Sequence, residues 1–178
     1  MTPRLGPWFA IALVAALSAC ALAVGSKGPT STDRNGPFVL SFEASAPSYA
    51  ANEPVIAVAQ LGYDGPETVA HLSGSGSGPI LFDIEQLDGD LDQSAFQDDD
   101  CKPHDLPAGQ PVEIAFRKSG AFDPASPRAN FWRDYFKEPD LRLPAGHYRL
   151  TAHVELSIGS GCTNEPLDLR ASLVIDVR

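Results

Sequence analysis

An all-β fold, an antiparallel β-sandwich of about seven strands with one short helix, is predicted by three features of the sequence. Short segments in which apolar and polar residues alternate recur along the chain, with turn residues between them. The 15 glycines and 16 prolines favour many turns over long helices. The apolar fraction of 43% is enough to form a core. The length of 178 residues suits one domain and a targeting segment.

The first expected strand begins at Phe38, because Phe38, Leu40 and Phe42 alternate with their neighbours. Further segments with strand composition between turn signals cover residues 55–63, 67–72, 80–87, 112–116, 148–156 and 167–177. The glycine-serine run at 74–78 is expected to be a flexible connection between two strands. It lacks both the G-x-S-x-G spacing of a nucleophile elbow and the lysine of a phosphate-binding loop.

One helix is predicted between residues 126 and 138. Ser126-Pro127 fits an N-cap followed by proline at the first helical position, and Pro139 prevents extension at the other end. Two interpretations remain open for its aromatic residues: they close one end of the sandwich, or they bind a partner, since aromatic residues and arginine are enriched in interface hot spots. The candidate partner-binding residues are Phe131, Trp132, Arg133, Tyr135 and Phe136.

A local motif refines the fold prediction. The segment Leu143-Pro144-Ala145-Gly146-His147-Tyr148 resembles the tyrosine corner of Ig-like sandwiches, in which a tyrosine hydrogen-bonds to the chain upstream. A related run, Leu106-Pro107-Ala108-Gly109, precedes the strand expected at 112. The resemblance implies an Ig-like domain over residues 37–178. The chain is also similar, in strand order and in these motifs, to the Ig-like domain of bacterial intracellular proteinase inhibitors, whereas its N-terminus contradicts an intracellular role.

The N-terminus has the form of an export signal. One arginine lies within the first four residues, and residues 5–24 carry no charge. Inside this run, Leu17-Ser18-Ala19-Cys20 resembles the lipobox of bacterial lipoproteins. The resemblance implies a signal peptide over 1–19, cleavage before Cys20, and lipid on Cys20 as diacylglycerol and palmitate-type acyl chains. The protein would then be held by this N-terminal lipid on the extracytoplasmic side of a membrane, at the periplasmic face or the cell surface.

Two alternatives remain for the N-terminus. Ala21-Leu22-Ala23 also fits the A-x-A pattern of ordinary signal peptidase, which would release a soluble protein. The uncharged run is also long enough to span a bilayer without cleavage. Residues 20–36 are small, polar and turn-rich, so they are expected to form a flexible tether. By resemblance to known lipoprotein sorting, Ala21 in place of aspartate after the cysteine favours the outer membrane.

The cysteine count supports lipidation. The chain has three cysteines, and one would be left over in an exported protein. If Cys20 carries lipid, an oxidising compartment would pair Cys101 with Cys162. Such a bridge is worth about 4 kcal/mol on the loop-entropy model. The alternative, a zinc site, lacks a C-x-x-C spacing.

The formal net charge of −10 argues against a nucleic-acid partner, which needs a basic face. Asp88, Asp90 and Asp92 open an acidic loop and are weak candidates for binding Ca²⁺. Gln93 stands where an EF-hand needs glycine, so a solvated acidic loop is the favoured interpretation. The four histidines lack the close spacing of metal ligands within one element, and no cofactor is expected.

No group of residues in the sequence has the pattern of a catalytic site, so a non-enzymatic function is expected. We therefore expect a membrane-anchored extracytoplasmic lipoprotein that acts as a binding or interaction module, with a protein of the cell envelope as its partner. One alternative is a proteinase-inhibitor-like or accessory subunit of a cell-envelope complex. A second alternative is a Ca²⁺-dependent extracytoplasmic binding domain.

Overall fold

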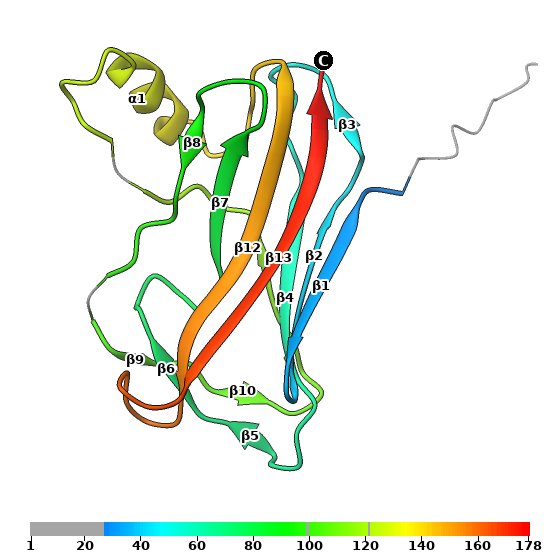
Figure 1. Ribbon diagram of the computed structural model, residues 1–178, viewed down its shortest axis with the longest axis vertical. Coiled ribbons are helices and arrows are strands. Elements are labelled where there is room, and N and C mark those ends of the chain that lie inside the picture. Colours follow the sequence, from blue (N-terminus) through cyan, green and yellow to red (C-terminus); the bar gives the residue numbers. More distant parts are fainter. Residues whose placement is uncertain (1–26, 99, 121) are drawn as a thin grey trace, which may run out of the picture.

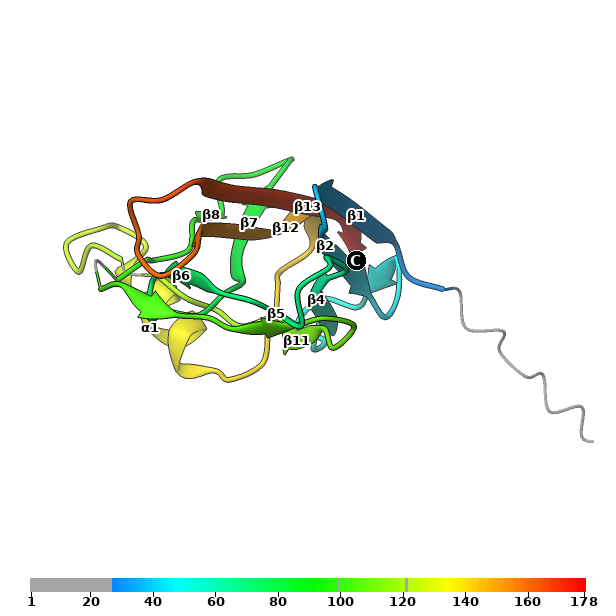
Figure 2. The ribbon, with the colours of Figure 1, turned by 90° about the horizontal axis from the view of Figure 1, so that it is seen from below.

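The computed structural model describes residues 27–98, 100–120 and 122–178. Two β-sheets pack face to face, and one helix lies at one end of them (Figures 1 and 2). Sheet A consists, in spatial order, of β1 (Thr30–Asn35), β2 (Phe38–Ala44), β4 (Ala57–Tyr63) and β11 (Val112–Ala115). The all-β sandwich with one helix is therefore confirmed.

Sheet B is built around the long hairpin of β12 (Gly146–Ile158) and β13 (Pro166–Val177). On the β13 side lies β3 (Ser48–Tyr49), paired in parallel. The other edge of β12 pairs first with β7 (Leu81–Gln86) and then with β6 (Leu72–Gly74). Two-residue strands complete the sheets: β8 (Asp92–Gln93) beside β7, β9 (Lys102–Pro103) beside β6, and the separate pair of β5 (Val69–Ala70) and β10 (Leu106–Pro107).

The core lies between the two sheets and follows from alternation. In β2 and β4 every second residue is buried, and Leu40 stands opposite Leu61 in the register. In the hairpin of sheet B, Leu150 stands opposite Leu173, and both are buried. The strands expected near 38, 55–63, 80–87, 112–116, 148–156 and 167–177 are all present.

The tether predicted over residues 20–36 is too long. Thr30–Asn35 forms β1, an edge strand that pairs with β2 in antiparallel register. Its sequence, TSTDRN, is polar and mostly exposed, so it has no apolar alternation to reveal it. Backbone pairing with β2 holds this edge strand, together with the Arg170 N–H that donates to Asp33 Oδ2 (2.8 Å). Residues 20–26 and the lipobox at 17–20 lie outside the described residues.

The strand predicted over 67–72 is divided in two. Val69–Ala70 pairs with β10, whereas Leu72–Gly74 pairs with β12, so the chain passes between sheets at His71. The connection at 74–78 is held by hydrogen bonds, because the Gly76 N–H donates to Asp100 Oδ1 (2.7 Å). Asp100 therefore fixes a run that composition alone described as a free linker.

Helix α1 (Ala129–Lys137) starts later than the Ser126-Pro127 motif predicts. Arg128 occupies the N-cap position without a side-chain cap, and the Ser126 hydroxyl instead accepts the Arg128 N–H (3.2 Å). The Ser126 hydroxyl thus stabilises the turn before the helix. The helix ends before Glu138-Pro139, as the proline predicts.

The tyrosine corner is present. The Tyr148 hydroxyl donates to the Pro144 carbonyl oxygen (3.0 Å), four residues upstream, and the Tyr148 side chain is fully buried. Burial, together with the nearby charge of Asp88, raises the pKa of Tyr148 to about 12. The motif therefore fixes the chain where it enters β12.

Candidate functional site

Helix α1 closes one end of the sandwich, which we call the lid end (Figure 1). Tyr135 is buried, and its hydroxyl donates to Gln93 Oε1 in β8 (3.0 Å). Phe131, Trp132 and Phe136 are half-buried and pack against the core. Their rings contact Tyr135 or one another with centroids 5.1–6.1 Å apart.

These contacts decide between the two interpretations of the aromatic helix. Tyr135 is 5% exposed, so little of its side chain is accessible to a partner. Burial also raises the pKa of its hydroxyl. Arg133 is exposed and donates to Asn130 Oδ1 (2.7 Å) within the same helix. The helix acts as a lid, and any partner would meet Arg133 and only the outer edges of Phe131, Trp132 and Phe136.

The candidate calcium ligands do not converge. Asp88 Oδ1 accepts the His147 N–H (2.9 Å), Asp90 pairs with Arg128, and Asp92 lies in β8 opposite Glu85. The pKa of Asp88 is lowered, chiefly by the His147 N–H. In the part of the chain that the structure describes, no group of three or more His, Cys, Asp or Glu side chains could hold a metal ion.

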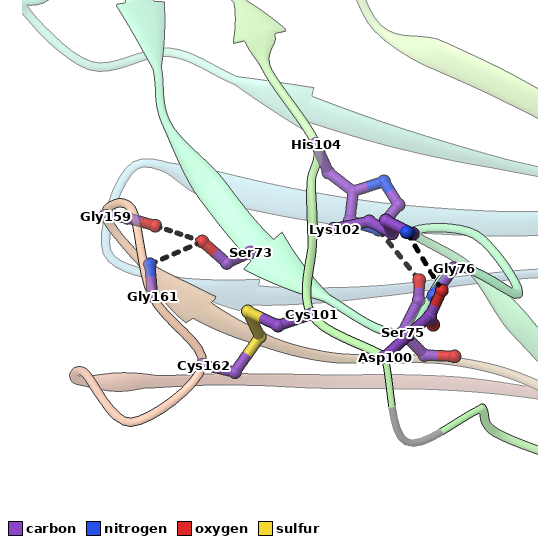
Figure 3. The surroundings of a disulfide bond; sticks show 10 residues. All are labelled: Ser73, Ser75, Gly76, Asp100, Cys101, Lys102, His104, Gly159, Gly161 and Cys162. Carbon is purple, nitrogen blue, oxygen red and sulfur yellow. Dashed lines mark hydrogen bonds and ion pairs between the residues drawn. A yellow bond between two sulfur atoms is a disulfide. The ribbon is translucent and has the colours of Figure 1, made fainter.

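Cys101 and Cys162 form a disulfide with their Cα atoms 5.9 Å apart, as predicted. The bond joins β9 to the hairpin loop between β12 and β13 (Figure 3). The Ser73 hydroxyl, buried between them, donates to the Gly159 carbonyl and accepts the Gly161 N–H (2.8 Å). We call this region, opposite the helix, the disulfide end (Figure 1).

Asp100, next to the disulfide, makes two contacts with its surroundings (Figure 3). It accepts the Gly76 N–H and lies 3.4 Å from Lys102 Nζ. The hydrogen bond from Gly76 is the main reason that the pKa of Asp100 is lowered. His104 Nε2 lies 2.8 Å from the Ser75 carbonyl, so both polar groups of the Ser75–Gly76 peptide have partners.

A polar groove runs along the outer face of sheet B, on β7, β12 and β13. It joins three hollows of about 320, 280 and 280 Å³. Glu155 and Asp168 line both the first and the second hollow, and Arg170 lines both the second and the third. Acidic side chains dominate this outer groove, and its only guanidinium groups among the lining residues are Arg149 and Arg170. The lining carboxylates are Asp33, Asp83, Glu85, Asp92, Asp98, Asp100, Glu155 and Asp168.

The centre of the outer groove is covered. Every second residue of a strand faces outward, and such residues are normally exposed. Thr151 and His153 on β12 face outward, yet each is only 6% exposed. Residues 94–98, which we call the crossing segment, bind two carboxylates beside these positions. The Ala95 N–H donates to Asp83 Oδ1 (2.8 Å), and Gln97 Nε2 donates to Glu155 Oε2 (2.7 Å).

His153 lies between the same two carboxylates. Its Nδ1 is 3.1 Å from Glu155 Oε1, and its Nε2 is 3.3 Å from Asp83 Oδ1. The Nε2 contact has the distance of an ion pair but not the geometry of a hydrogen bond. Desolvation by burial acts to raise the pKa of Asp83, but the contact with His153, the hydrogen bond from the Ala95 N–H and the charge of Arg170 together lower it.

No protein-family model matches the chain, and no curated protein sequence is significantly similar to it. The structure itself therefore carries the functional argument. In the described ranges, no helix is long and apolar enough to cross a membrane.

The outer groove was not predicted from the sequence, although a signal for it is present. Alternate residues of β12, Arg149, Thr151, His153 and Glu155, are polar or charged, and so are Asp168, Arg170 and Ser172 on β13. This period of two marks a polar face. The covering by the crossing segment depends on contacts between positions far apart in the sequence, so no local pattern shows it.

Proposed function

We propose that this protein is an exported, lipid-anchored, non-enzymatic binding module that recognises its partner through the outer groove of sheet B. The disulfide is the observation that carries the export part of the proposal. Cys101–Cys162 pairing requires an oxidising compartment. It also accounts for two of the three cysteines, which supports lipid as the fate of Cys20.

The place where the chain enters the domain determines how a lipid-anchored protein would be oriented at the membrane. The Ala44 N–H donates to the Pro29 carbonyl (3.1 Å), so the chain enters the domain beside the end of β2. This end also holds the C-terminus, whereas β5, β6, β9 and β10 lie at the opposite end (Figure 1). A lipid on Cys20 would lie at most about 25 Å from Lys27. The disulfide end would therefore point away from the membrane.

The intact mass of the protein from the membrane fraction tests the anchor, with Cys20→Ala alongside the wild type. We expect the wild-type mass to show loss of residues 1–19 and the addition of diacylglycerol and acyl chains, and the variant to lack both changes. An unmodified chain that starts after Ala23, or a full-length chain, would contradict lipid anchoring.

The excess of carboxylates in the outer groove supports a partner with a cationic segment. An oligolysine peptide is a suitable probe, with amide chemical shifts as the readout. We expect shifts along β12 and β13 that Asp168→Lys abolishes. The matched control is Glu43→Lys, an identical change in charge on the exposed face of β2. Equal loss in both variants would show a non-specific charge effect and contradict recognition by the outer groove.

The alternative of an accessory subunit in an envelope complex uses the same anchor and the same groove. The calcium-dependent alternative has no support from Asp88, Asp90 and Asp92, because Asp88 and Asp90 bind different partners and Asp92 lies apart from them in β8.

A further inference from the structure

Two contacts of the crossing segment, those of Ala95 and Gln97, end on carboxylates that also face one buried side chain, His153. Asp98, at the end of the segment, is held separately by Ser75 and Ser77. The His153 side chain is 7% exposed, and each of its two ring nitrogens faces a carboxylate oxygen within 3.3 Å. A neutral imidazole has one N–H and one lone pair. Whichever tautomer is present, a neutral ring therefore directs a lone pair at Asp83 or Glu155. Only the doubly protonated ring presents an N–H to Glu155 and also a positive charge to Asp83, whose contact with Nε2 has the distance of an ion pair.

The charges around His153 lead to the same conclusion. Asp83 reaches it from β7 and Glu155 from β12. From β13, Arg170 approaches both carboxylates, at 3.8 Å and 3.7 Å, and its backbone N–H donates to Asp33 of β1 (2.8 Å). The crossing segment contributes the uncharged Ala95 N–H and the Gln97 amide. Asp33 and Asp168 line the same hollow as His153, so carboxylates outnumber the one guanidinium there. A neutral His153 increases this excess of negative charge.

The same two carboxylates hold the crossing segment, because Asp83 accepts from Ala95 and Glu155 from Gln97. We propose that His153 is a pH-sensitive latch, which holds the crossing segment on sheet B when its ring is protonated and loosens it when the ring is neutral. Loss of the proton leaves one carboxylate facing a lone pair, so that carboxylate is free to turn away and release its bond to the segment.

Release of the segment changes the outer groove. Ser94 lines one hollow and Gln97 lines another, so the segment lies between them. Leu81, which stands opposite His153 in the register and is 5% exposed, would become accessible with Thr151. Phe96 on the segment is already 55% exposed. The latch therefore controls how much of the groove is open, whether or not the protein is lipid-anchored.

The test is the solvent exchange of the Ala95 amide, measured by NMR from about pH 5 to pH 8, where histidine side chains change charge. The protection factor at each pH is the intrinsic exchange rate divided by the measured exchange rate. In the wild type we expect this factor to fall about tenfold as the pH rises, as for loss of one charge-assisted interaction. In His153→Gln, which does not titrate, the factor should be independent of pH.

His147→Gln is the matched control. His147 lies on the same strand and pairs with Asp176 at 2.6 Å, but it is 60% exposed and does not contact the crossing segment. It should keep the wild-type pH dependence. The latch proposal is wrong if the wild-type protection factor of the Ala95 amide does not change with pH, or if its pH dependence persists in His153→Gln.

If His153→Gln does not fold, NMR titration of the wild-type protein still tests the proposal. The ¹⁵N shifts of the His153 ring report its protonation directly, and the Ala95 amide shift reports the crossing segment. The latch requires both transitions to have the same midpoint. An Ala95 transition at a different pH from that of the His153 ring would overturn it.

Discussion

The two ends of the sandwich are closed in different ways. At the lid end, α1 places aromatic rings over the core, and Tyr135 is buried among them. At the disulfide end, the closing loops are rich in glycine and serine, and Cys101 and Cys162 are themselves exposed. The lid end is stabilised by apolar burial, which is the same in every compartment. The disulfide end relies on a covalent bond, so its stability depends on where the protein is located.

The largest expected effect is at the disulfide end. Replacing both cysteines, in Cys101→Ser/Cys162→Ser, should lower the free energy of unfolding by up to about 4 kcal/mol, because the unfolded chain is no longer cross-linked. Chemical denaturation measures this loss. Hydrogen exchange should locate the loosening in β9 and the β12–β13 loop, with α1 unchanged. The wild-type protein treated with a reductant should behave like the variant. Equal loosening of α1 would contradict the view that the two ends of the sandwich are stabilised independently.

The next effect is at the lid end. Tyr135→Ala removes a buried ring and should lower the free energy of unfolding by about 3 kcal/mol. Asp134→Ala, an exposed neighbour in the same helix, is the control and should change it by less than about 0.5 kcal/mol. Thermal denaturation of both variants measures the difference. A small effect of Tyr135→Ala would mean that the helix is a detachable recognition element and not a lid.

A smaller effect comes from one hydroxyl in the lid. Tyr135→Phe keeps the ring but removes the hydrogen bond to the buried Gln93, so we expect a loss of about 1 kcal/mol. This loss of stability should vanish when Tyr135→Phe is made in a Gln93→Leu protein, because residue 93 then has no amide oxygen that needs a donor. A double-mutant cycle measured by urea denaturation gives this coupling energy. A coupling of zero would show that the hydrogen bond contributes nothing to the lid.

The two ends should also differ in their response to pH. An unfolded tyrosine ionises near pH 10. Burial raises the pKa of Tyr135, and that of Tyr148 to about 12, so unfolding releases protons above about pH 10 and stability falls as the pH rises. The pKa of Asp100 is lowered, so its contribution is present above about pH 4 and is lost as the pH falls.

Stability curves against pH check both directions. Tyr135→Phe should flatten the alkaline fall, and Asp100→Asn should flatten the acid fall. If either variant changed the opposite limb of the curve, the assignment of these groups to the two ends would be wrong.

Much of the fold is readable from local patterns. Alternation at Phe38, Leu40 and Phe42 reports burial of one face of a strand directly, and the Tyr148 motif reports a single hydrogen bond to Pro144. The disulfide follows from the number of cysteines. Each of these features depends on residues close in sequence or on a small number of candidates.

The features that sequence analysis missed depend on distant partners. Strand β1 is polar and is held by its pairing with β2. The cover over His153 arises because residues 94–98 bind Asp83 and Glu155 from two different strands. Tyr135 is buried because Gln93 and the core lie beneath it, which the sequence of the helix does not show. Local composition cannot supply such contacts.

The redox state of Cys101 and Cys162 in cells tests most directly whether this fold is made for export. Thiols are trapped with a maleimide-polyethylene glycol in membrane fractions from cells that express the full chain, beside a variant that lacks residues 1–19. We predict no labelling at Cys101 or Cys162 in the membrane-bound protein, and labelling of both in the variant retained inside the cell. Labelled Cys101 and Cys162 in the membrane-bound protein would contradict the account.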